Sequence, residues 1–460
     1  MNFLLFSTIH WDASDGVHQS PQLARELARL GHPVLFVQPR PSSNIGTAGL
    51  PIQIISLQDL GLSAQLVERA WHGLNVGPLD GVAQCLVAKL RAIEKPAEPG
   101  ISIWFSPFDP FARLLPLVHS RGYHPFYYPV DDFDSMAALG YKRMNPRAEQ
   151  YLAGQAEIIF AVCEPVARKM RGTGKPVCVV RNGICLEDWQ QAPSGGETGR
   201  EIVTGQRTLG FWGWLSTIMV DPALIEYVAR QHPEWAINLI GDLERNPGRV
   251  FPVERLSRLP NIRLLGSVDH SRLADLGKRF DACLVPAPDN DFSRGRDPLK
   301  VYEYLALHKP VITAHMPQLA DMPYVRNGDT PEDFVKAIQT ALATEVKPAV
   351  VDAYLSRQTW AARADEFLSI VSDHLAQKES RAPEPAAAPG SLVAPSFAGD
   401  VPGLAEYLDL VESDLERTRA WAKELEAAAR AKQQELERIY SLPPARFIRR
   451  LRRLFRRKRS

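Results

Sequence analysis

Residues that could bind a diphosphate gather in one short stretch late in the chain. Asp297 precedes Pro298, a pair typical of a helix start, so the stretch predicts a helix that Asp297 caps and Pro298 begins. The first N–H groups of such a helix and the positive end of its dipole face the preceding loop. Arg294, Arg296 and Lys300 add three cations around this terminus. The stretch therefore predicts a site suited to a diphosphate.

A carboxylate follows one turn further along the same predicted helix. Glu303 comes three residues after Lys300, so the two side chains share one helical face. There the carboxylate is well placed to accept hydrogen bonds from two adjacent ribose hydroxyls, and we interpret the stretch as a nucleoside-diphosphate pocket. The alternative is an exposed Lys300–Glu303 helix pair that contributes ~0.3 kcal/mol and has no further role.

The elements that would position this pocket follow an α/β pattern. Short apolar runs alternate with amphipathic segments through about residue 377, which is typical of parallel sheets covered by helices. Further helix starts with an early proline are predicted at Ser20-Pro21, Asp221-Pro222 and Thr330-Pro331. The expected strands are Phe3–Phe6, Val34–Val37, Ile101–Phe105, Pro125–Tyr128, Ile158–Val162, Val177–Val180, Leu209–Trp212, Ala236–Ile240, Ile262–Leu265, Ala282–Val285 and Val311–Thr313.

The expected fold class is α/β, with two doubly wound Rossmann-like domains that face each other across a cleft. Residues 1–190 form the first domain, and the polar segment 191–206 connects it to the second. Residues 207–377 form the second domain with its closing helices. Folds of this kind bind ligands at the carboxyl ends of their strands, so the cleft between the two sheets is the expected site.

Composition excludes several classes of protein. At about 150 residues per domain, 460 residues suggest about three units, too many for a small disulfide-stapled module. The five cysteines are an odd number without C-x-x-C spacing, and we expect buried, reduced thiols in a cytosolic protein. No apolar run reaches the ~18 residues of a membrane-spanning helix. The opening residues lack the basic start and apolar length of a secretory signal.

The third part of the chain differs in composition from the first two. Residues 378–402 are rich in Pro, Ala and Ser and predict a flexible linker, because they offer too little apolar area to fold. Residues 403–440 predict a helical, coiled-coil-like segment, with a weak heptad pattern over 404–439. This segment predicts either a homodimer or a single amphipathic helix that lies on the body.

The end of the chain is strongly basic. The net charge of the whole chain is +1, but residues 446–460 hold nine Lys or Arg and no acid, so the first 445 residues carry −8. Residues 441–460 predict a basic amphipathic helix in a membrane interface, with ~1 kcal/mol contributed per basic residue near anionic lipid. Nucleic acid is the rival polyanion, but it has no use for the apolar face, so no nucleic-acid partner is expected. The residues assigned to membrane binding are Phe447, Ile448, Leu451, Leu454, Phe455, Arg449, Arg452 and Arg453.

Several segments resemble one family of enzymes. The stretch DPLKVYEYLALHKPVIT is similar to the nucleotide-sugar motif of two-domain, family-4-like (group 1) glycosyltransferases with the GT-B architecture. HWDASDGVHQSPQLARELARLGHPVLFV, YYPVDDFD, AEIIFAVCEPVARKM, VVRNGI, LGFWGWLS and LPNIRLLGSV resemble the same group. The resemblance covers about residues 1 to 370. It implies transfer of a sugar from a nucleotide donor, bound mainly by the second domain, to an acceptor bound by the first.

The resemblance also assigns roles in the second domain. Glu303 matches the glutamate that holds the donor ribose, and Lys300 matches the diphosphate contact. Gly213 matches a glycine near the phosphates or the sugar, while Gly266 and Val268 fall in the loop whose main chain reads the base. Two departures leave the donor sugar, and retention or inversion, open. The second glutamate usual in the motif is replaced by Gly295, and GWLSTIMVDP lacks the usual basic residue.

Candidate residues of the first domain come from two loops. Gly16 would let a backbone approach the transferred sugar, and His10, Asp12, Asp15 or His18 could contact acceptor or donor hydroxyls. Asp131 and Asp132 follow a predicted strand and would reach the cleft. There a carboxylate suits the base that an inverting transfer requires; either aspartate could instead cap the next turn. No cofactor and no metal are expected, because the cationic terminus can balance the leaving diphosphate.

The function expected from the sequence is a metal-independent glycosyltransferase at the cytoplasmic face of the plasma membrane. It would use a nucleotide sugar and a lipid-linked or polysaccharide acceptor, with the basic tail holding it peripherally on the membrane. Two alternatives stay open, a nucleotide-sugar epimerase of the same architecture and a catalytically inactive membrane scaffold. The sequence leaves the donor sugar, the nucleotide base, the acceptor and the linkage undetermined.

Overall fold

The structure, a computed structural model, describes part of the chain. The described residues are 1–11, 18–42, 46–47, 49–190, 202–244, 250–380, 393–394 and 396–397. The predicted coil and basic tail, with every residue assigned to membrane binding, lie outside them, and so do Asp12, Asp15 and Gly16. The described residues belong to one compact unit, Met1–Gly399.

The first domain is built on a parallel sheet. Among the described residues it has seven strands in the order β3-β2-β1-β4-β5-β6-β7. Every pairing in it is parallel, as the predicted crossover pattern requires. The strands are β1 (Asn2–Phe6), β2 (Val34–Gln38), β3 (Ile52–Ser56), β4 (Gly100–Trp104), β5 (Tyr123–Tyr127), β6 (Ile158–Ala161) and β7 (Val177–Val179).

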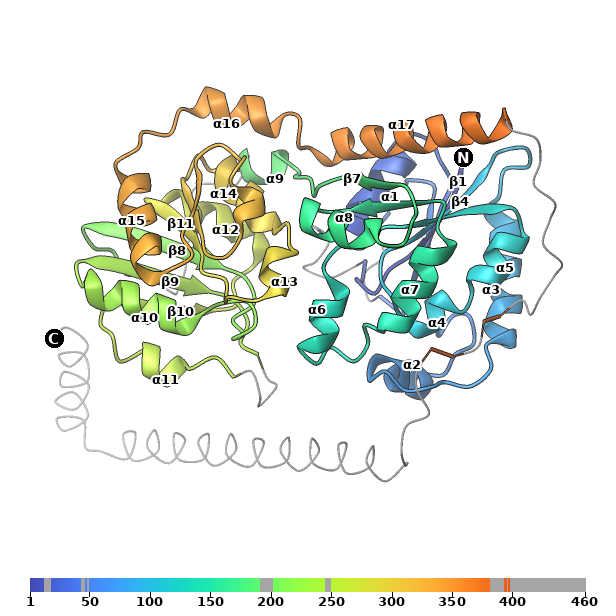
Figure 1. Ribbon diagram of the computed structural model, residues 1–460, viewed down its shortest axis with the longest axis horizontal. Helices are drawn as coiled ribbons and strands as arrows, with labels where there is room; N and C mark the ends of the chain where they lie inside the picture. Colours follow the sequence, from blue (N-terminus) through green and yellow to red (C-terminus); the bar gives the residue numbers. More distant parts are fainter. Residues whose placement is uncertain are drawn as a thin grey trace, which may run out of the picture. The chain divides into compact units, whose positions relative to one another are not determined.

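The second domain repeats this plan (Figure 1). Its sheet has six parallel strands within the described residues, in the order β10-β9-β8-β11-β12-β13. In each sheet the strand order reverses beside the first strand, and ligands of doubly wound folds bind at the carboxyl ends of strands at such a point. The strands are β8 (Arg207–Trp212), β9 (Trp235–Ile240), β10 (Ile262–Gly266), β11 (Ala282–Val285), β12 (Val311–Thr313) and β13 (Val325–Asn327).

Helices cover the sheets and connect their strands. Those of the first half are α1 (Gln19–Arg29), α2 (Ala64–Trp71), α3 (Asp80–Ile93), α4 (Asp109–Ala112), α5 (Leu115–Ser120), α6 (Phe133–Ala138), α7 (Pro146–Gln155), α8 (Glu164–Arg171) and α9 (Glu187–Gln190). Those of the second half are α10 (Pro222–Gln231), α11 (Val253–Leu256), α12 (Leu273–Lys278), α13 (Asp291–Arg294), α14 (Leu299–Ala306), α15 (Pro331–Leu342), α16 (Pro348–Leu355) and α17 (Trp360–Glu379), with short 3-10 turns at η2 (His270–Arg272) and η3 (Pro317–Leu319).

The predicted α/β class and two-sheet architecture are confirmed, and every predicted strand is present within a residue or two of its expected bounds. The strands β3 and β13 were not predicted. Residues of β3 are only partly buried along most of its length, and β13 has three residues, so neither gives a long apolar run.

The predicted helix starts divide into two groups. Asp221 caps α10 by accepting from the N–H of Ala223 at 2.8 Å, and Thr330 caps α15 by accepting from the N–H of Asp333 at 3.1 Å, as predicted. The other two predictions are wrong. Helix α1 begins at Gln19 after His18, because the Ser20 hydroxyl is instead buried in a hydrogen bond with Ser7. Helix α14 begins after Pro298, and Asp297 does not cap it.

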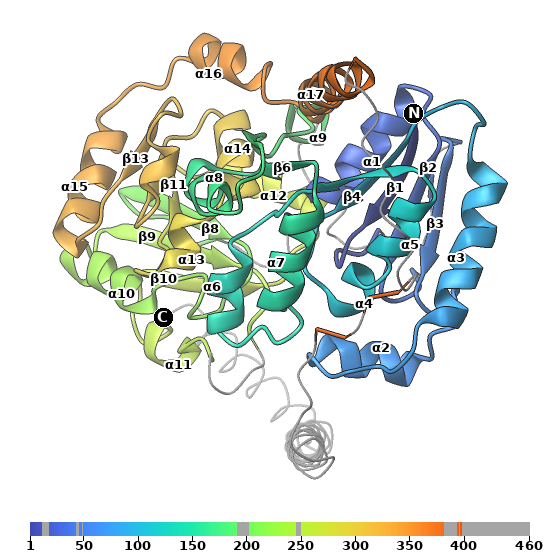
Figure 2. The same cartoon turned by 45° about the vertical axis from the view of Figure 1, so that its right-hand side comes forward.

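Helix α17 belongs to the first domain rather than to the second. It packs against α1, as Figures 1 and 2 show, and its residues Ala364, Phe367 and Val371 are fully buried in the core of the first sheet. The chain therefore crosses back after α16, so the closing helix expected within residues 207–377 is corrected to the first domain. Glu157, before β6, accepts from Lys378 Nζ at 2.6 Å and contacts His374 Nε2 at 2.7 Å, which ties the helix down.

The predicted flexible linker is also corrected in part. Residues 393–394 and 396–397 fall within the predicted linker 378–402, yet they lie against the first domain. The N–H of Ala394 donates to the carbonyl of Arg113 at 3.0 Å, and Ala394 is 7% exposed. Composition alone missed this contact because it depends on a receptor site formed by distant residues.

All five cysteines are free thiols, but their burial varies. Cys163 and Cys283 are buried as predicted, Cys178 and Cys185 are partly exposed, and Cys85 is exposed. No helix within the described part of the chain has both the length and the apolar character needed to cross a membrane.

Candidate functional site

Three glycines end three neighbouring strands of the second sheet. Gly213, Gly241 and Gly266 follow or end β8, β9 and β10, and all three have positive φ angles of 136°, 144° and 71°. Their backbones touch: a Cβ at Gly241 would lie 1.7 Å from the carbonyl oxygen of Gly213, and the N–H of Gly241 donates to the carbonyl of Gly266 at 2.9 Å. We call these residues the glycine edge. Because it carries no side chains, a ligand can approach its main chain closely.

Lys300 reaches this edge from α14. A Cβ on Gly213 would lie 2.4 Å from Lys300 Nζ, and this ammonium lies 4.5 Å from the centre of the Phe211 ring. Burial, reinforced by the charge of Arg296 and opposed by that of Glu303, lowers the pKa of Lys300 to about 7. The two residues assigned to the diphosphate, Gly213 and Lys300, are thus adjacent.

The N-terminus of α14 has no side-chain cap. Its N-cap residue is Pro298, which makes no side-chain capping bond, while the N–H of Val301 donates to the carbonyl of Pro298 at 3.0 Å. Arg296 lies just before this terminus and is 9% exposed, with its guanidinium 5.1 Å from the centre of the Phe292 ring. Its buried Nη1 has no hydrogen-bond partner among the described residues. A buried, unsatisfied guanidinium beside an uncapped helix terminus is a good anion site.

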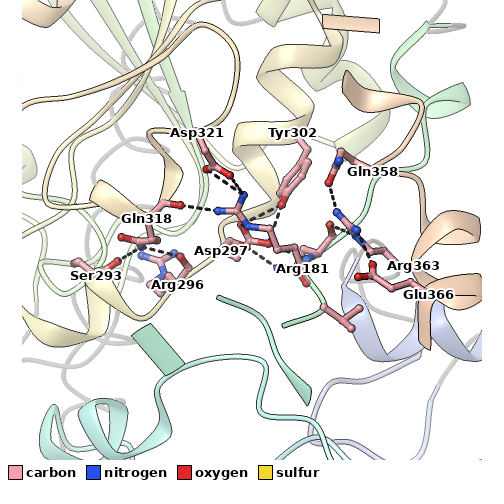
Figure 3. A network of polar contacts seen from close by, with 12 residues as sticks. Arg181, Ser293, Arg296, Asp297, Tyr302, Gln318, Asp321, Gln358, Arg363 and Glu366 are labelled. Carbon is pink, nitrogen blue, oxygen red and sulfur yellow. Dashed lines mark hydrogen bonds and ion pairs between the residues drawn. The ribbon is translucent and has the colours of Figure 1, made fainter. Parts of the chain in front are cut away.

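Asp297 anchors this loop instead of capping the helix (Figure 3). Its buried carboxylate accepts from the N–H of Asn182 at 2.8 Å and from the Tyr302 hydroxyl at 2.9 Å. The side chain of Asn182 donates in turn to the Asp297 carbonyl at 2.5 Å, and Arg181 Nε lies 3.8 Å from the carboxylate. The predicted capping role is wrong because these partners hold the side chain away from the first N–H groups of α14.

Arg181 joins the two domains through this network and was not among the predicted site residues. Its guanidinium donates to the carbonyl of Gln318 at 2.6 Å and to the carboxylate of Asp321 at 3.0 Å. Gln318 donates in turn to the carbonyl of Arg296 at 2.8 Å. Arg181 follows the last strand of the first sheet, so it fixes the loop before α14 from the other domain (Figure 3). Its place in VVRNGI was the available signal.

Glu303 lies in an aromatic enclosure. It is 8% exposed, and its Oε2 accepts from Trp212 Nε1 at 2.7 Å. Its Oε1 lies 3.9 Å from His270 Nε2, and the Glu303 carboxylate raises the pKa of His270. The ring of Trp189 stacks on that of Trp212 with centroids 5.6 Å apart. The alternative of an exposed Lys300–Glu303 pair is excluded, since Glu303 is buried. The aromatic partners of Glu303 were not predicted.

The loop predicted to read the nucleotide base lies at the same edge of the second sheet. Gly266 ends β10, and Val268 packs against the apolar cluster that contains Trp212. Gly266 and Gly241 also line a cavity of about 380 Å³ together with Leu215 and Leu243. Such a volume is within the range of small-molecule sites.

The first domain contributes Asp131 to this region. Burial raises the pKa of Asp131 to about 6, against the opposing charges of Arg296 and His18. Arg296 belongs to the second domain and His18 precedes α1, so these three predicted residues are brought close enough for their charges to interact. A carboxyl group with a pKa near neutrality is suited to proton transfer.

Asp132 and Arg294 have other partners. Asp132 is the N-cap of α6: it accepts from the N–H of Ser135 at 3.2 Å and from Lys169 Nζ at 2.7 Å. Gly295 packs on it, since a Cβ there would lie 2.6 Å from the Asp132 Cβ. Arg294 forms ion pairs with Asp289 and Asp291 and is two-fifths exposed. Neither residue is directed to α14 by these contacts.

No group of three or more His, Cys, Asp or Glu side chains suited to a metal occurs within the described part of the chain.

The fold of this chain is similar to that of solved structures. No family model matches the chain. The chain superimposes on sucrose-phosphate synthase from Thermosynechococcus elongatus with a TM-score of 0.58, covering 82% of this chain and 99% of that one at 16% identity. For HepE of Anabaena in complex with UDP, the TM-score is 0.59 over 81% of this chain and 100% of that one, at 12% identity. The chain has the GT-B fold. The resemblance to GT-B glycosyltransferases in the sequence is thus confirmed at the level of the fold.

One curated relative matches part of this GT-B chain. TuaH of Bacillus subtilis (strain 168), provisionally assigned as a teichuronic acid biosynthesis glycosyltransferase, is 30% identical over 187 residues. The match spans 38% of this chain and 45% of TuaH, so it covers less than half of that relative. A further solved neighbour is the lipopolysaccharide outer core galactosyltransferase WaaB, with a TM-score of 0.55 and 13% identity over 82% of this chain and 100% of WaaB.

Proposed function

We propose that this GT-B protein is a glycosyltransferase that takes a sugar from a nucleotide-diphosphate donor. The observation that carries the proposal is the meeting of Lys300 Nζ with the backbone of Gly213 beside the uncapped N-terminus of α14. A diphosphate there would accept hydrogen bonds from backbone N–H groups and from the cations Lys300 and Arg296. Solved GT-B relatives include a protein in complex with UDP-glucose, which supports this class of donor.

Glu303 is proposed to bind the donor ribose. Trp212 holds one oxygen of its carboxylate, which orients the group before a ligand arrives. The second oxygen can then accept from a ribose hydroxyl, with His270 as its protein neighbour at 3.9 Å. The main chain of Gly266 and Val268 would lie beside the nucleotide base, as the family resemblance implies.

The proposed reaction breaks the bond between the anomeric carbon and the β-phosphate oxygen. The leaving diphosphate takes the electron pair, and the N-terminus of α14, Lys300 and Arg296 stabilise its charge. An acceptor oxygen forms the new bond to the anomeric carbon and loses its proton. In an inverting transfer Asp131 would take that proton, for which its pKa of about 6 is suitable. We propose that no metal is needed, because these cations face the diphosphate; activity should survive chelation with EDTA.

Calorimetry with UDP and GDP tests the donor site. Lys300→Met should weaken binding about 10- to 100-fold, the loss expected for one charge-assisted hydrogen bond. Lys309→Met is the matched control: Lys309 follows the other end of α14 and donates to the carbonyl of Lys278, so its loss should leave binding unchanged. Equal binding by wild type and Lys300→Met would overturn the proposed site.

Sugar transfer itself needs a second measurement. Donor consumption with release of the nucleoside diphosphate supports transfer or hydrolysis, whereas formation of an epimeric nucleotide sugar would support the epimerase alternative. Failure to bind any nucleoside diphosphate would support the scaffold alternative.

The acceptor and the cellular place are further proposals. We propose a lipid-linked or polysaccharide acceptor, because a basic amphipathic tail over 441–460 would hold the enzyme peripherally at the cytoplasmic face of the plasma membrane. Homodimer formation through 404–439 is a related proposal. Deletion of 441–460 should abolish binding to anionic liposomes without changing nucleotide affinity, and retained binding would contradict the tail assignment.

A further inference from the structure

A buried ion pair lies on the first domain, away from the residues assigned to the donor. Asp109 begins α4 and Arg113 is its C-cap, and the two residues are 4% and 5% exposed. Their closest charged atoms are 3.8 Å apart, which is too long for a hydrogen bond. Burying two charges costs free energy unless further hydrogen bonds satisfy them.

A distant part of the chain supplies such hydrogen bonds. Arg113 Nε donates to the carbonyl of Ala394 at 3.0 Å, while the N–H of Ala394 donates to the carbonyl of Arg113 at 3.0 Å. Asp109 Oδ1 accepts from the N–H of Phe397 at 2.6 Å and from the Ser396 hydroxyl at 3.1 Å. Both buried charges are therefore bonded to a segment more than 280 positions away in sequence.

Apolar contacts accompany these polar ones. The ring of Phe397 packs on that of Tyr151 in α7, with centroids 4.9 Å apart. Val393 and Phe397 pack against the core of the first domain, and Ala394 is buried. Figure 2 shows these described residues as short orange-red pieces close to α4. Main-chain bonds, a charged receptor pair and an aromatic contact together form a specific peptide site.

We propose that Asp109, Arg113 and Tyr151 form a receptor site whose ligand is a segment of this chain itself, which includes the described residues 393–394 and 396–397. We call this contact the clip. It holds Ala394, Ser396 and Phe397 against α4 and α7 of the first domain. It depends on no part of the proposed function.

Amide hydrogen exchange of the full-length chain tests the clip. In the wild type, peptides covering 393–397 should exchange at least ~10-fold more slowly than a synthetic peptide of the same sequence, because the Ala394 and Phe397 amides are hydrogen-bonded. Phe397→Pro removes both the donor N–H and the ring and should abolish that protection. The variant lies outside both sheets, so the protection of α1 should be unchanged. Ser380→Ala is the matched control, since its exposed hydroxyl bonds only within α17 in the described structure, to Gln377.

A receptor-side variant completes the test. Asp109→Asn keeps the size of the side chain but removes the charge that strengthens the Phe397 hydrogen bond, so exchange over 393–397 should accelerate while α1 stays protected. Wild-type exchange at the rate of the free peptide would overturn the clip, as would full protection in both Phe397→Pro and Asp109→Asn. Protection that increases with protein concentration would identify a second copy as the donor of the segment and overturn the assignment to the same chain.

Discussion

The indole N–H of Trp212 donates a hydrogen bond of 2.7 Å to the Oε2 atom of Glu303. Trp212 ends the first strand of the second sheet, Glu303 lies in α14, and both side chains are buried. The ring of Trp212 also stacks on that of Trp189, which lies in the segment that leaves the first domain. The position of the carboxylate is thus set by the end of β8 and by helices α9 and α14, so it needs little rearrangement when a ligand binds.

We expect Trp212→Phe to separate this orientation from simple packing. The variant keeps an aromatic ring against Trp189 but leaves a buried carboxylate oxygen without its donor, which should cost about 1–3 kcal/mol of unfolding free energy. UDP affinity should also fall, by about 5- to 10-fold, because Glu303 is no longer held. Urea unfolding and calorimetry measure the two effects.

Trp235→Phe is a suitable comparison for that experiment. Trp235 begins β9, at the amino end of the sheet, where its ring stacks on His232. It should lower stability without changing UDP affinity. If Trp212→Phe also left the affinity unchanged, the orienting role of Trp212 would be contradicted.

The lowered pKa of Lys300 predicts a pH-dependent donor affinity. Burial and the charge of Arg296 lower this pKa to about 7, so the free protein loses the ammonium proton as the pH rises through 7. A bound diphosphate favours the ammonium, and binding should therefore take up a proton. UDP affinity should decrease between pH 7 and 9, and the calorimetric enthalpy should depend on the ionisation enthalpy of the buffer. Lys300→Met should remove this dependence, while Lys309→Met should keep it.

The raised pKa of Asp131 predicts that catalytic activity falls at low pH. If the carboxylate is the base, kcat/KM should fall about tenfold per pH unit below the pKa of about 6, because protonation removes the acceptor of the proton. Asp131→Asn should reduce kcat by about 10²- to 10⁴-fold and leave UDP affinity near the wild-type value. Asp134→Asn, three residues on and more exposed, should retain most activity. An unchanged acid limb in an active Asp131→Asn variant would exclude this role.

Gly213 predicts a local clash. With φ at 136° and a Cβ position 2.4 Å from Lys300 Nζ, Gly213→Ala should both strain the backbone and displace the ammonium. Stability and UDP affinity should fall together in thermal unfolding and calorimetry. Gly154→Ala is the opposite case, because Gly154 lies within α7 with nothing within 4 Å of the added carbon, and it should stabilise by about 0.5–1 kcal/mol. A tolerated Gly213→Ala would mean that the glycine edge is not tightly packed.

The sequence predicted those parts of the site that depend on local pattern. Apolar runs placed the strands. The i and i+3 spacing placed Lys300 and Glu303 on one face of a helix. Each of these predictions uses residues close together in sequence, for which backbone geometry alone decides the outcome.

The parts that failed depend on contacts between distant residues. Asp297 has the residue type and position of an N-cap. Its carboxylate instead accepts a hydrogen bond from the N–H of Asn182, 115 positions earlier. The pairing of Trp212 with Glu303 spans 91 positions. Helix α17 carries no local sign that it returns to the first sheet. Local propensity is a weak prior where a buried polar group finds a better tertiary partner.

Glu157 predicts how the closing helix responds to acid. Burial alone would raise its pKa, but hydrogen bonds from His124, Lys378 and His374 outweigh burial and lower the pKa to about 2. A carboxyl group with a lowered folded-state pKa stabilises the fold above its unfolded value, near 4.5, and this contribution is lost as the pH falls toward 2. Allowing for partial solvent screening, the contribution at neutral pH is on the order of 2 kcal/mol.

Glu157→Gln should lower stability by about that amount and flatten the loss of stability between pH 4.5 and 2, measured by urea unfolding at a series of pH values. Glu164→Gln removes an exposed partner of Arg171 that is screened by solvent, so it should flatten the acid slope much less than Glu157→Gln does. Parallel acid slopes for wild type and Glu157→Gln would mean that α17 is held by its apolar contacts alone.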